Sequence, residues 1–313
     1  MKKEQKLSNI DFAQKYGILL VLLIMWLILL CVSPTFRTMD NAVNILRQVS
    51  VNGIIAIGMT FVIMTGGIDL TVGSLIAVSG VVAGSILVAN PNGVIVAILA
   101  ALLACGLFGA MNGFFVAHMK VPAFVATLAG MTIARGFAYV YSDGKPYTLA
   151  SEGFSYIGKG SVPIIIFLII AFLSHILLSK MKFGRYIYAT GGNIKAAGAS
   201  GVNVKKVLLK VYILGGVLAG IAGIVLASRT NSGQPAVGVA YETDAIAAAV
   251  IGGTSMTGGV GTIGGTLIGI LIIGTLNNGL NLLDVSSYYQ QIIKGLIILG
   301  AVCFDIRSKD SSK

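Results

Sequence analysis

The segment from Lys180 to Lys210, KMKFGRYIYATGGNIKAAGASGVNVKKVLLK, is the one long polar stretch in an otherwise apolar chain. It carries seven basic residues and no acidic residue. Apolar runs flank it on both sides, at 162–179 and 207–228. Because such runs are close to the length that crosses the hydrocarbon core of a bilayer, we expect the segment to be a polar loop between two membrane spans.

The composition extends this interpretation to the whole chain. The 313 residues are 56% hydrophobic and 11% charged, and the mean hydropathy is +0.92. A soluble domain of this size needs far more charge to cover its surface. Many of the 41 glycines lie inside apolar runs, where small residues four apart let helices approach closely in lipid. The predicted fold class is an all-α polytopic membrane protein of about ten transmembrane helices, some of them broken by glycine or re-entrant.

The distribution of charge predicts the orientation. Much of the net charge of +11 comes from basic residues in 1–16, in the segment that opens this section, and in 305–313. Positive charge kept on the cytoplasmic side explains this pattern without nucleic acid. We therefore expect a single transmembrane domain, 17–304, in the bacterial inner membrane, with lipid around it. Both termini and a loop of about 180–206 are expected in the cytoplasm.

Ten apolar segments are the expected spans: 17–32, 45–65, 70–89, 94–117, 122–141, 162–179, 207–228, 244–254, 263–283 and 288–304. The segment 244–254 is short for a crossing, and 229–243 is expected to be an outer loop. Stretches 56–73 and 245–261 resemble each other weakly, because each is an apolar helix interrupted by glycines. Internal repeats with interrupted helices are common in transporters.

The centre of the polar loop predicts a short capped helix. Asn193 is a good N-cap, 194–200 favours a helix, and Gly201 suits the left-handed position after it. Small side chains on this helix suit a close contact with another protein, while an ordinary basic loop is the alternative. The residues expected to make that contact are Gly191 and Gly192, taken as a hinge, with Asn193, Ala196, Ala197, Ser200 and Gly201.

Ionisable and amide side chains near or inside the apolar runs are costly to bury and therefore informative. Arg135, Asp244 and Lys294 are of this kind. Each is explained equally well by a structural role, such as a helix cap or a buried ion pair. Amides in such surroundings bind a hydroxylated solute or join helices. The expected translocation pathway comprises Gly66, Gly67, Asp69, Asn112, Asn277, Asn278 and Asn281.

No nucleotide, metal or catalytic site is expected in the chain. The run 153–160 resembles a phosphate-binding loop but ends in glycine, where a hydroxyl is needed for magnesium. The pattern G-x-G-x-x-G at 259–264 leads into an apolar span instead of a βαβ unit. The three cysteines and two histidines show no ligand spacing.

Five stretches resemble one known family, the permease subunits of bacterial ABC importers for monosaccharides, and within it those for ribose. They are GMTFVIMTGGIDLTVGS (58–74), GRYIYATGGN (184–193), SGVNVKK (200–206), YETDAIAAAVIGGTSMTGG (241–259) and NNGLNLLDVSSYYQQIIKG (277–295). The resemblance implies import of ribose or a similar sugar by a homodimer of permeases. It also implies two cytoplasmic ABC ATPase subunits, which bind ATP and magnesium, and an extracytoplasmic sugar-binding protein.

The resemblance further implies that the region from Gly192 to Gly201 is the helix that contacts the ATPase. Many relatives have an acidic residue where this chain has Ile194. Many also have a basic residue where it has Val260 and Thr262. These departures concern the details of the ATPase contact.

Two other functional classes remain as alternatives. One is an ion- or proton-coupled secondary carrier for a small polar solute that uses Asp69 and Arg135. The other is a membrane-embedded enzyme, which the absence of a nucleophile–base pair in the sequence disfavours.

Overall fold

The computed structural model describes the backbone of residues 2–310 and the side chains of 17–300, 302 and 303. Most of these residues are in helices. The elements are α1 (Lys2–Val32), the short 3-10 helix η1 (Thr35–Arg37), α2 (Met39–Met64), α3 (Val72–Ala89), α4 (Val94–Ala117), α5 (Ala123–Tyr141), β1 (Tyr147–Thr148), α6 (Glu152–Ile157), α7 (Val162–Ser179), α8 (Lys182–Gly192), α9 (Ile194–Ala199), α10 (Val204–Thr230), β2 (Ser232–Gly233), α11 (Tyr241–Ile251), α12 (Ile263–Leu282) and α13 (Ser287–Asp310).

The helix lengths confirm the predicted fold class. Within the described residues, seven helices are long and apolar enough to cross a bilayer: α2, α3, α4, α5, α7, α10 and α12. The bounds of α4 and α7 coincide with the expected spans, since a turn or a polar residue ends each apolar run. The apolar part of α1, Gly17–Val32, is shorter. The expected span 244–254 is the 11-residue helix α11.

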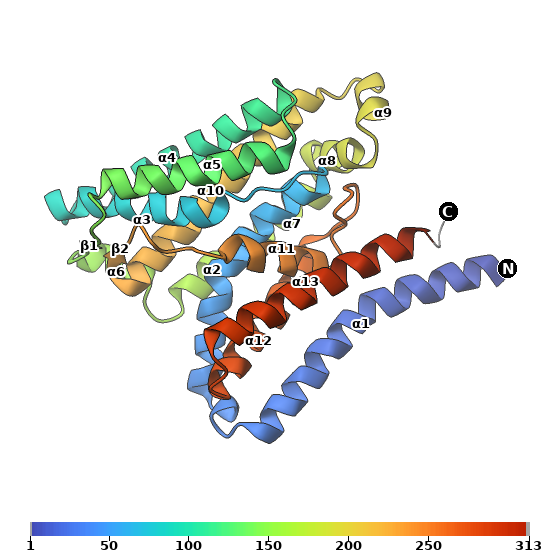
Figure 1. The fold of residues 1–313 in the computed structure, drawn as a ribbon, viewed down its shortest axis with the longest axis horizontal. Helices are drawn as coiled ribbons and strands as arrows, with labels where there is room; N and C mark the ends of the chain where they lie inside the picture. Colours follow the sequence, from blue (N-terminus) through green and yellow to red (C-terminus); the bar gives the residue numbers. More distant parts are fainter. Residues whose placement is uncertain (1, 311–313) are drawn as a thin grey trace.

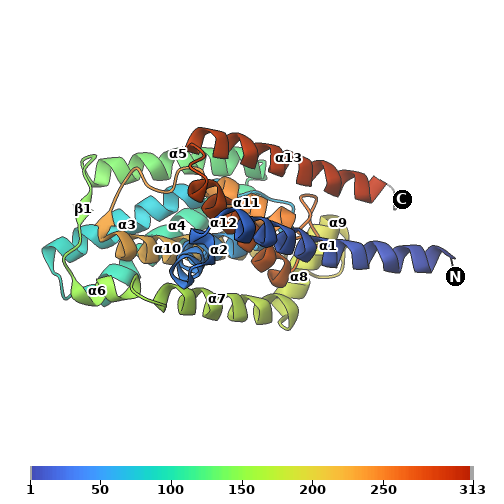
Figure 2. The same cartoon turned by 90° about the horizontal axis from the view of Figure 1, so that it is seen from below.

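Three helices form the interior and three others cover it. In the most apolar windows of α2, α3 and α10, 78% of the residues are buried, against 22% in α4 and 28% in α5 and α7. Figure 2 shows α5 and α7 on opposite sides of this interior. The apolar residues exposed on α4, α5 and α7 thus form an outer surface that is suited to contact with hydrocarbon.

Glycines bring α4 and α10 into backbone contact. A Cβ added to Gly109 would lie 2.4 Å from the carbonyl oxygen of Tyr212, and one added to Gly216 would lie 2.5 Å from that of Cys105. No larger side chain fits at either position without moving a helix. The prediction that small residues in the apolar runs pack helices together is confirmed here.

The two ends of the molecule carry different elements. Helices α8 and α9 lie at one end, toward which the start of α1 and the end of α13 also extend (Figure 1). We call this the α9 end. At the opposite end, the β end, lie α6 and the antiparallel pair β1–β2, in which Tyr147 faces Gly233.

Residues 231–240 were expected to belong to an outer loop, and the structure shows that part of this loop packs between helices. The segment leaves β2 and packs between helices. A Cβ added to Gly233 would lie 2.2 Å from the carbonyl oxygen of Gly80, and one added to Gly238 would lie 2.1 Å from that of Gly73. An Arg135 nitrogen, Nη1, donates to the carbonyl oxygens of Pro235 at 2.7 Å and Val237 at 2.6 Å. Arg135 therefore has a structural role, because it satisfies backbone carbonyls that have no helix partner.

Candidate functional site

The capped helix predicted in the polar loop is present as α9. The Asn193 side-chain oxygen accepts a hydrogen bond from the Ala196 amide at 3.0 Å. Gly201 has a φ of +84°, the left-handed conformation expected after the helix. Asn203 caps the next helix, α10, through the Lys206 amide at 3.0 Å. The polar loop is therefore an ordered pair of helices, α8 and α9.

The surface that α9 presents differs from the prediction at one residue. Ala197 is only 5% exposed, because its methyl group faces the protein. It therefore packs α9 on the rest of the chain and does not face a partner. Ile194 is 54% exposed, and Ala196 and Ser200 are exposed as well. The outer face of α9 is small and partly apolar.

Gly191 and Gly192, the predicted hinge, are the last two residues of α8, and the helix ends at Asn193, whose backbone is extended. A Cβ added to Gly191 would lie 1.8 Å from the Met64 carbonyl oxygen and 2.4 Å from the Gly259 nitrogen. Nothing lies within 4 Å of a Cβ added to Gly192. Gly191 is required for close packing, whereas a side chain at Gly192 would face open space, although the Gly192 backbone lies against Gly259.

Gly191 belongs to a set of backbone contacts that we call the glycine junction: Met64 to Gly66, Gly191, and Gly258 to Gly261. The Gly259 amide donates to the Met64 carbonyl oxygen at 2.9 Å. Gly66, Gly258 and Gly259 have φ values of +78°, +85° and +77°, which only glycine adopts readily. The junction joins α8 to the end of α2 and to the loop between α11 and α12. The two weakly similar stretches thus meet where the glycine break of the first, at Gly66, contacts Gly258 near the end of the second.

The Tyr188 side chain adds a hydrogen bond beside this junction. Its hydroxyl donates to the Gly261 carbonyl oxygen at 2.8 Å. Partial burial raises the pKa of the Tyr188 hydroxyl above its ordinary value, so this group remains a neutral donor at physiological pH. The bond ties α8 directly to the α11–α12 loop.

Asp69 and Asn112 are brought together through Thr71. The Thr71 amide donates to an Asp69 oxygen, Oδ1, at 2.9 Å, and the Thr71 hydroxyl donates to the same oxygen. The Asn112 amide donates to the Thr71 hydroxyl at 3.2 Å. Asp69 is fully buried. Its other oxygen and the Tyr212 hydroxyl have no hydrogen-bond partner among the described residues.

Asp69 and Arg135, the pair that the secondary-carrier alternative requires, do not bond each other. Asp69 accepts from Thr71, and Arg135 donates to the 231–240 segment. The geometry gives no support to a shared ion or proton site on these two residues.

Two of the amides expected in the pathway join helices. Asn278 and Asn41 exchange two hydrogen bonds, at 2.8 Å and 3.1 Å, between α12 and α2. Asn281 accepts from Gln290 at 2.7 Å, between α12 and α13. These geometries match the helix-joining alternative.

A third group of polar side chains lies where α2, α11, α12 and α13 meet. The Lys294 ammonium lies 2.9 Å from one Asp244 oxygen and 3.1 Å from the other. The amide groups of Asn52 and Asn277 both donate to Asp244 at 3.4 Å. We call these four residues the polar cluster. The sequence singled out Asp244, Lys294 and Asn277 separately, and it missed Asn52, whose signal is an amide inside an apolar run.

Comparison with known proteins identifies the family. Residues 41–302 match the family described as "Branched-chain amino acid transport system / permease component". The chain belongs to this permease family. The ribose import permease protein of Bacillus subtilis is 47% identical to this chain, and the match covers 97% of each of the two chains. The ribose import permease of Haemophilus influenzae is 48% identical over 91% of both. The L-arabinose permease of Escherichia coli is 39% identical over 96% of this chain and 92% of its own length. No solved structure matches.

These findings confirm the resemblance to monosaccharide-importer permeases. They leave the roles of individual residues in the permease as predictions. The expected pathway residues lie in separate places. Gly66 lies in the glycine junction, and Gly67 lies beside Tyr212. Asp69 and Asn112 both bond to Thr71. Asn277 lies in the polar cluster, whereas Asn278 and Asn281 join helices.

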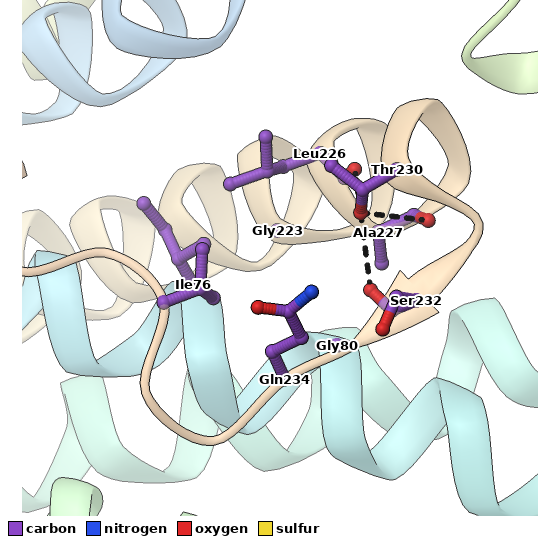
Figure 3. A pocket seen from close by; sticks show the side chains of 9 residues that line it. Ile76, Gly80, Gly223, Leu226, Ala227, Thr230, Ser232 and Gln234 are labelled. Atoms are coloured by element: carbon purple, nitrogen blue, oxygen red, sulfur yellow. Dashed lines mark hydrogen bonds between the residues drawn. The ribbon is translucent and has the colours of Figure 1, made fainter. Parts of the chain in front are cut away.

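A small cavity lies near the β end of the permease, between α3, α10 and the 231–240 segment. The side chain of Gln234 points into it, between Gly80 and Gly223 (Figure 3). Its volume is about 30 Å³, room for one or two water molecules. A monosaccharide does not fit in it, so the cavity is not a sugar site in this conformation.

Proposed function

We propose that this permease is the membrane-spanning subunit of an ATP-driven importer that carries ribose or a similar monosaccharide across the cytoplasmic membrane. The likeness to ribose import permeases over more than nine tenths of the chain carries this proposal. The identity over that length is 47%. The five stretches that resemble sugar-importer permeases, which run in order from 58 to 295, support the same proposal.

The α9 end faces the cytoplasm and binds an ABC ATPase, which supplies the ATP and magnesium site. The basic residues of the polar loop support this orientation. Helix α9 offers the ATPase an exposed, capped surface of small residues with Ile194 at its start. A second copy of the permease completes the pathway. A sugar-binding protein docks at the β end.

The coupling step follows from the glycine junction. When the ATPase dimer closes, it displaces α8 and α9 together, because a single residue, Asn193, joins the two helices. The backbone contact of Gly191 with Met64 and Gly259 transmits this displacement to α2 and to the α11–α12 loop. Backbone contacts leave no flexible side chain between the elements to absorb the movement. Access to the pathway then alternates as these helices move.

The proposal is tested by sugar uptake into proteoliposomes that contain the permease, its ATPase and its sugar-binding protein. We expect uptake of labelled ribose that requires ATP on the ATPase side and persists after an ionophore collapses every ion gradient. Uptake driven by an ion gradient without ATP would establish the secondary carrier in its place.

A further inference from the structure

We propose that the polar cluster of Asn52, Asp244, Asn277 and Lys294 is a contact site for the hydroxyl groups of the sugar as it crosses the membrane. This inference rests on the proposed function and adds a site to it. The expected ligand is a neutral, polyhydroxylated solute of monosaccharide size.

The position of the cluster is the first argument. Its four side chains come from α2, α11, α12 and α13, and so the cluster forms only when four helices meet. Asn52 lies near the middle of the apolar helix α2. Polar groups in such surroundings are costly unless they serve function or structure.

The second argument is unused hydrogen-bonding capacity. Asn52 and Asn277 each make one long side-chain bond, at 3.4 Å, and both bonds end on the same Asp244 oxygen. An amide side chain offers two donors and one acceptor oxygen. The Asn277 oxygen is buried and has no partner among the described residues. Sugar hydroxyls, which both donate and accept, satisfy these groups.

Another amide pair in the same protein shows what a purely structural arrangement looks like. Asn41 and Asn278 use both amide groups on each other, at 2.8 Å and 3.1 Å. Asn278 follows Asn277 directly on α12, yet only Asn278 has a closed pair. The contrast separates a helix-joining amide from one that retains free donors and an acceptor.

The charge and exposure of the cluster favour a neutral solute. Asp244 and Lys294 neutralise each other at 2.9 Å, so the site does not attract an ion of either sign. The side chain of Lys294 keeps 19% of its surface exposed, against 7% for Asp244. The ion pair is therefore more open on the lysine side, and this is the side from which we expect solute to reach it.

The test compares Asn52→Ala and Asn277→Ala with the wild-type transporter in proteoliposomes, measuring both labelled D-ribose uptake and ATP hydrolysis. Both substitutions leave the ion pair intact. Loss of one hydrogen bond to the moving sugar should lower uptake per ATP hydrolysed by about fivefold, while hydrolysis stimulated by the binding protein stays close to wild type. Asn44→Ala, on an exposed position of the same helix, is the matched control and should change neither.

A second measurement does not depend on transport. In a variant with Cys31→Ser and Cys303→Ser, single substitutions Asn52→Cys and Asn277→Cys should react with a charged, water-soluble thiol reagent during ATP turnover. Ile292→Cys, 59% exposed on the outer face of α13, should not react because lipid keeps its thiol protonated.

Four results would overturn the inference. Uptake per ATP that is unchanged in both alanine variants rejects the site alone, and so does an absence of thiol labelling at both cluster positions. If uptake in the alanine variants fell only in proportion to the amount of assembled transporter or to its ATP hydrolysis, the cluster would have a structural role only. A wild-type complex that hydrolyses ATP but carries no monosaccharide rejects the proposed function, and the sugar site with it.

Discussion

At the scale of single residues, the protein depends on glycines and amides whose surroundings differ sharply between neighbours. A Cβ added to Gly191 would meet two other backbones, while one added to Gly192 would meet nothing. Asn278 uses both parts of its amide on Asn41, whereas the Asn277 oxygen has no partner among the described residues. Since the neighbours are alike in sequence, single substitutions separate their roles.

Gly191→Ala should destabilise the permease, whereas Gly192→Ala should be neutral or slightly stabilising. The added methyl group at position 191 collides with the Met64 carbonyl and the Gly259 amide, and such overpacking costs about 1–3 kcal/mol. At position 192 the methyl group meets nothing, and alanine is the better helix former. Thermal unfolding of the detergent-purified variants measures the difference. Equal melting temperatures would contradict the glycine junction.

Asn278→Ala should cost about 1–3 kcal/mol, because it leaves the buried Asn41 amide without a partner. The double variant Asn41→Ala/Asn278→Ala should cost less than the sum of the two single variants. A double-mutant cycle on unfolding free energies measures this coupling. Strict additivity would mean that the two amides do not interact.

At the scale of elements, the segment 231–240 is held in place by contacts from helices distant in sequence. Arg135 on α5 bonds two of its carbonyls, and Gly73 and Gly80 on α3 make room for its backbone. Extended backbone inside a helical membrane protein needs such partners, because no water is present to supply hydrogen bonds.

Arg135→Leu should loosen the 231–240 segment without unfolding the helices around it. Two carbonyl oxygens lose their donors, and each bond to a charged group is worth about 1.5–3 kcal/mol. Hydrogen exchange of residues 231–243 should become faster while that of α2 stays unchanged. Thr132→Ala, exposed on the same helix, is the control. Unchanged exchange in the Arg135 variant would show that the glycine contacts alone hold the segment.

At the scale of the whole molecule, the two ends are chemically distinct. The α9 end carries the basic polar loop, and the β end carries α6 and the β1–β2 pair (Figure 1). In the orientation that we propose, the positive charge places the α9 end in the cytoplasm.

Single cysteines report this orientation directly. In a variant with Cys31→Ser and Cys303→Ser, Gly198→Cys on α9 should react only when a membrane-impermeant reagent reaches the cytoplasmic side. Lys159→Cys, exposed after α6, should react only from the outside. Labelling of both positions from one side would contradict the orientation.

The sequence alone determined the class of fold, most helix boundaries and the family. Apolar runs in lipid must form helices, because each backbone group needs a partner within its own segment. The caps of α9 were equally local, since Asn193 and Gly201 act on residues within one turn. Local rules of this kind are readable from the chain without knowing which helices meet.

Only the tertiary structure decided which polar residues share a site. It turned Ala197 inward, closed Asn41 on Asn278, and assembled Asn52, Asp244, Asn277 and Lys294 from four helices. It also placed 231–240 between helices instead of outside them. Each outcome depends on the rotation and register of helices far apart in the chain, and those are set by close packing at glycines that sequence spacing does not assign to partners.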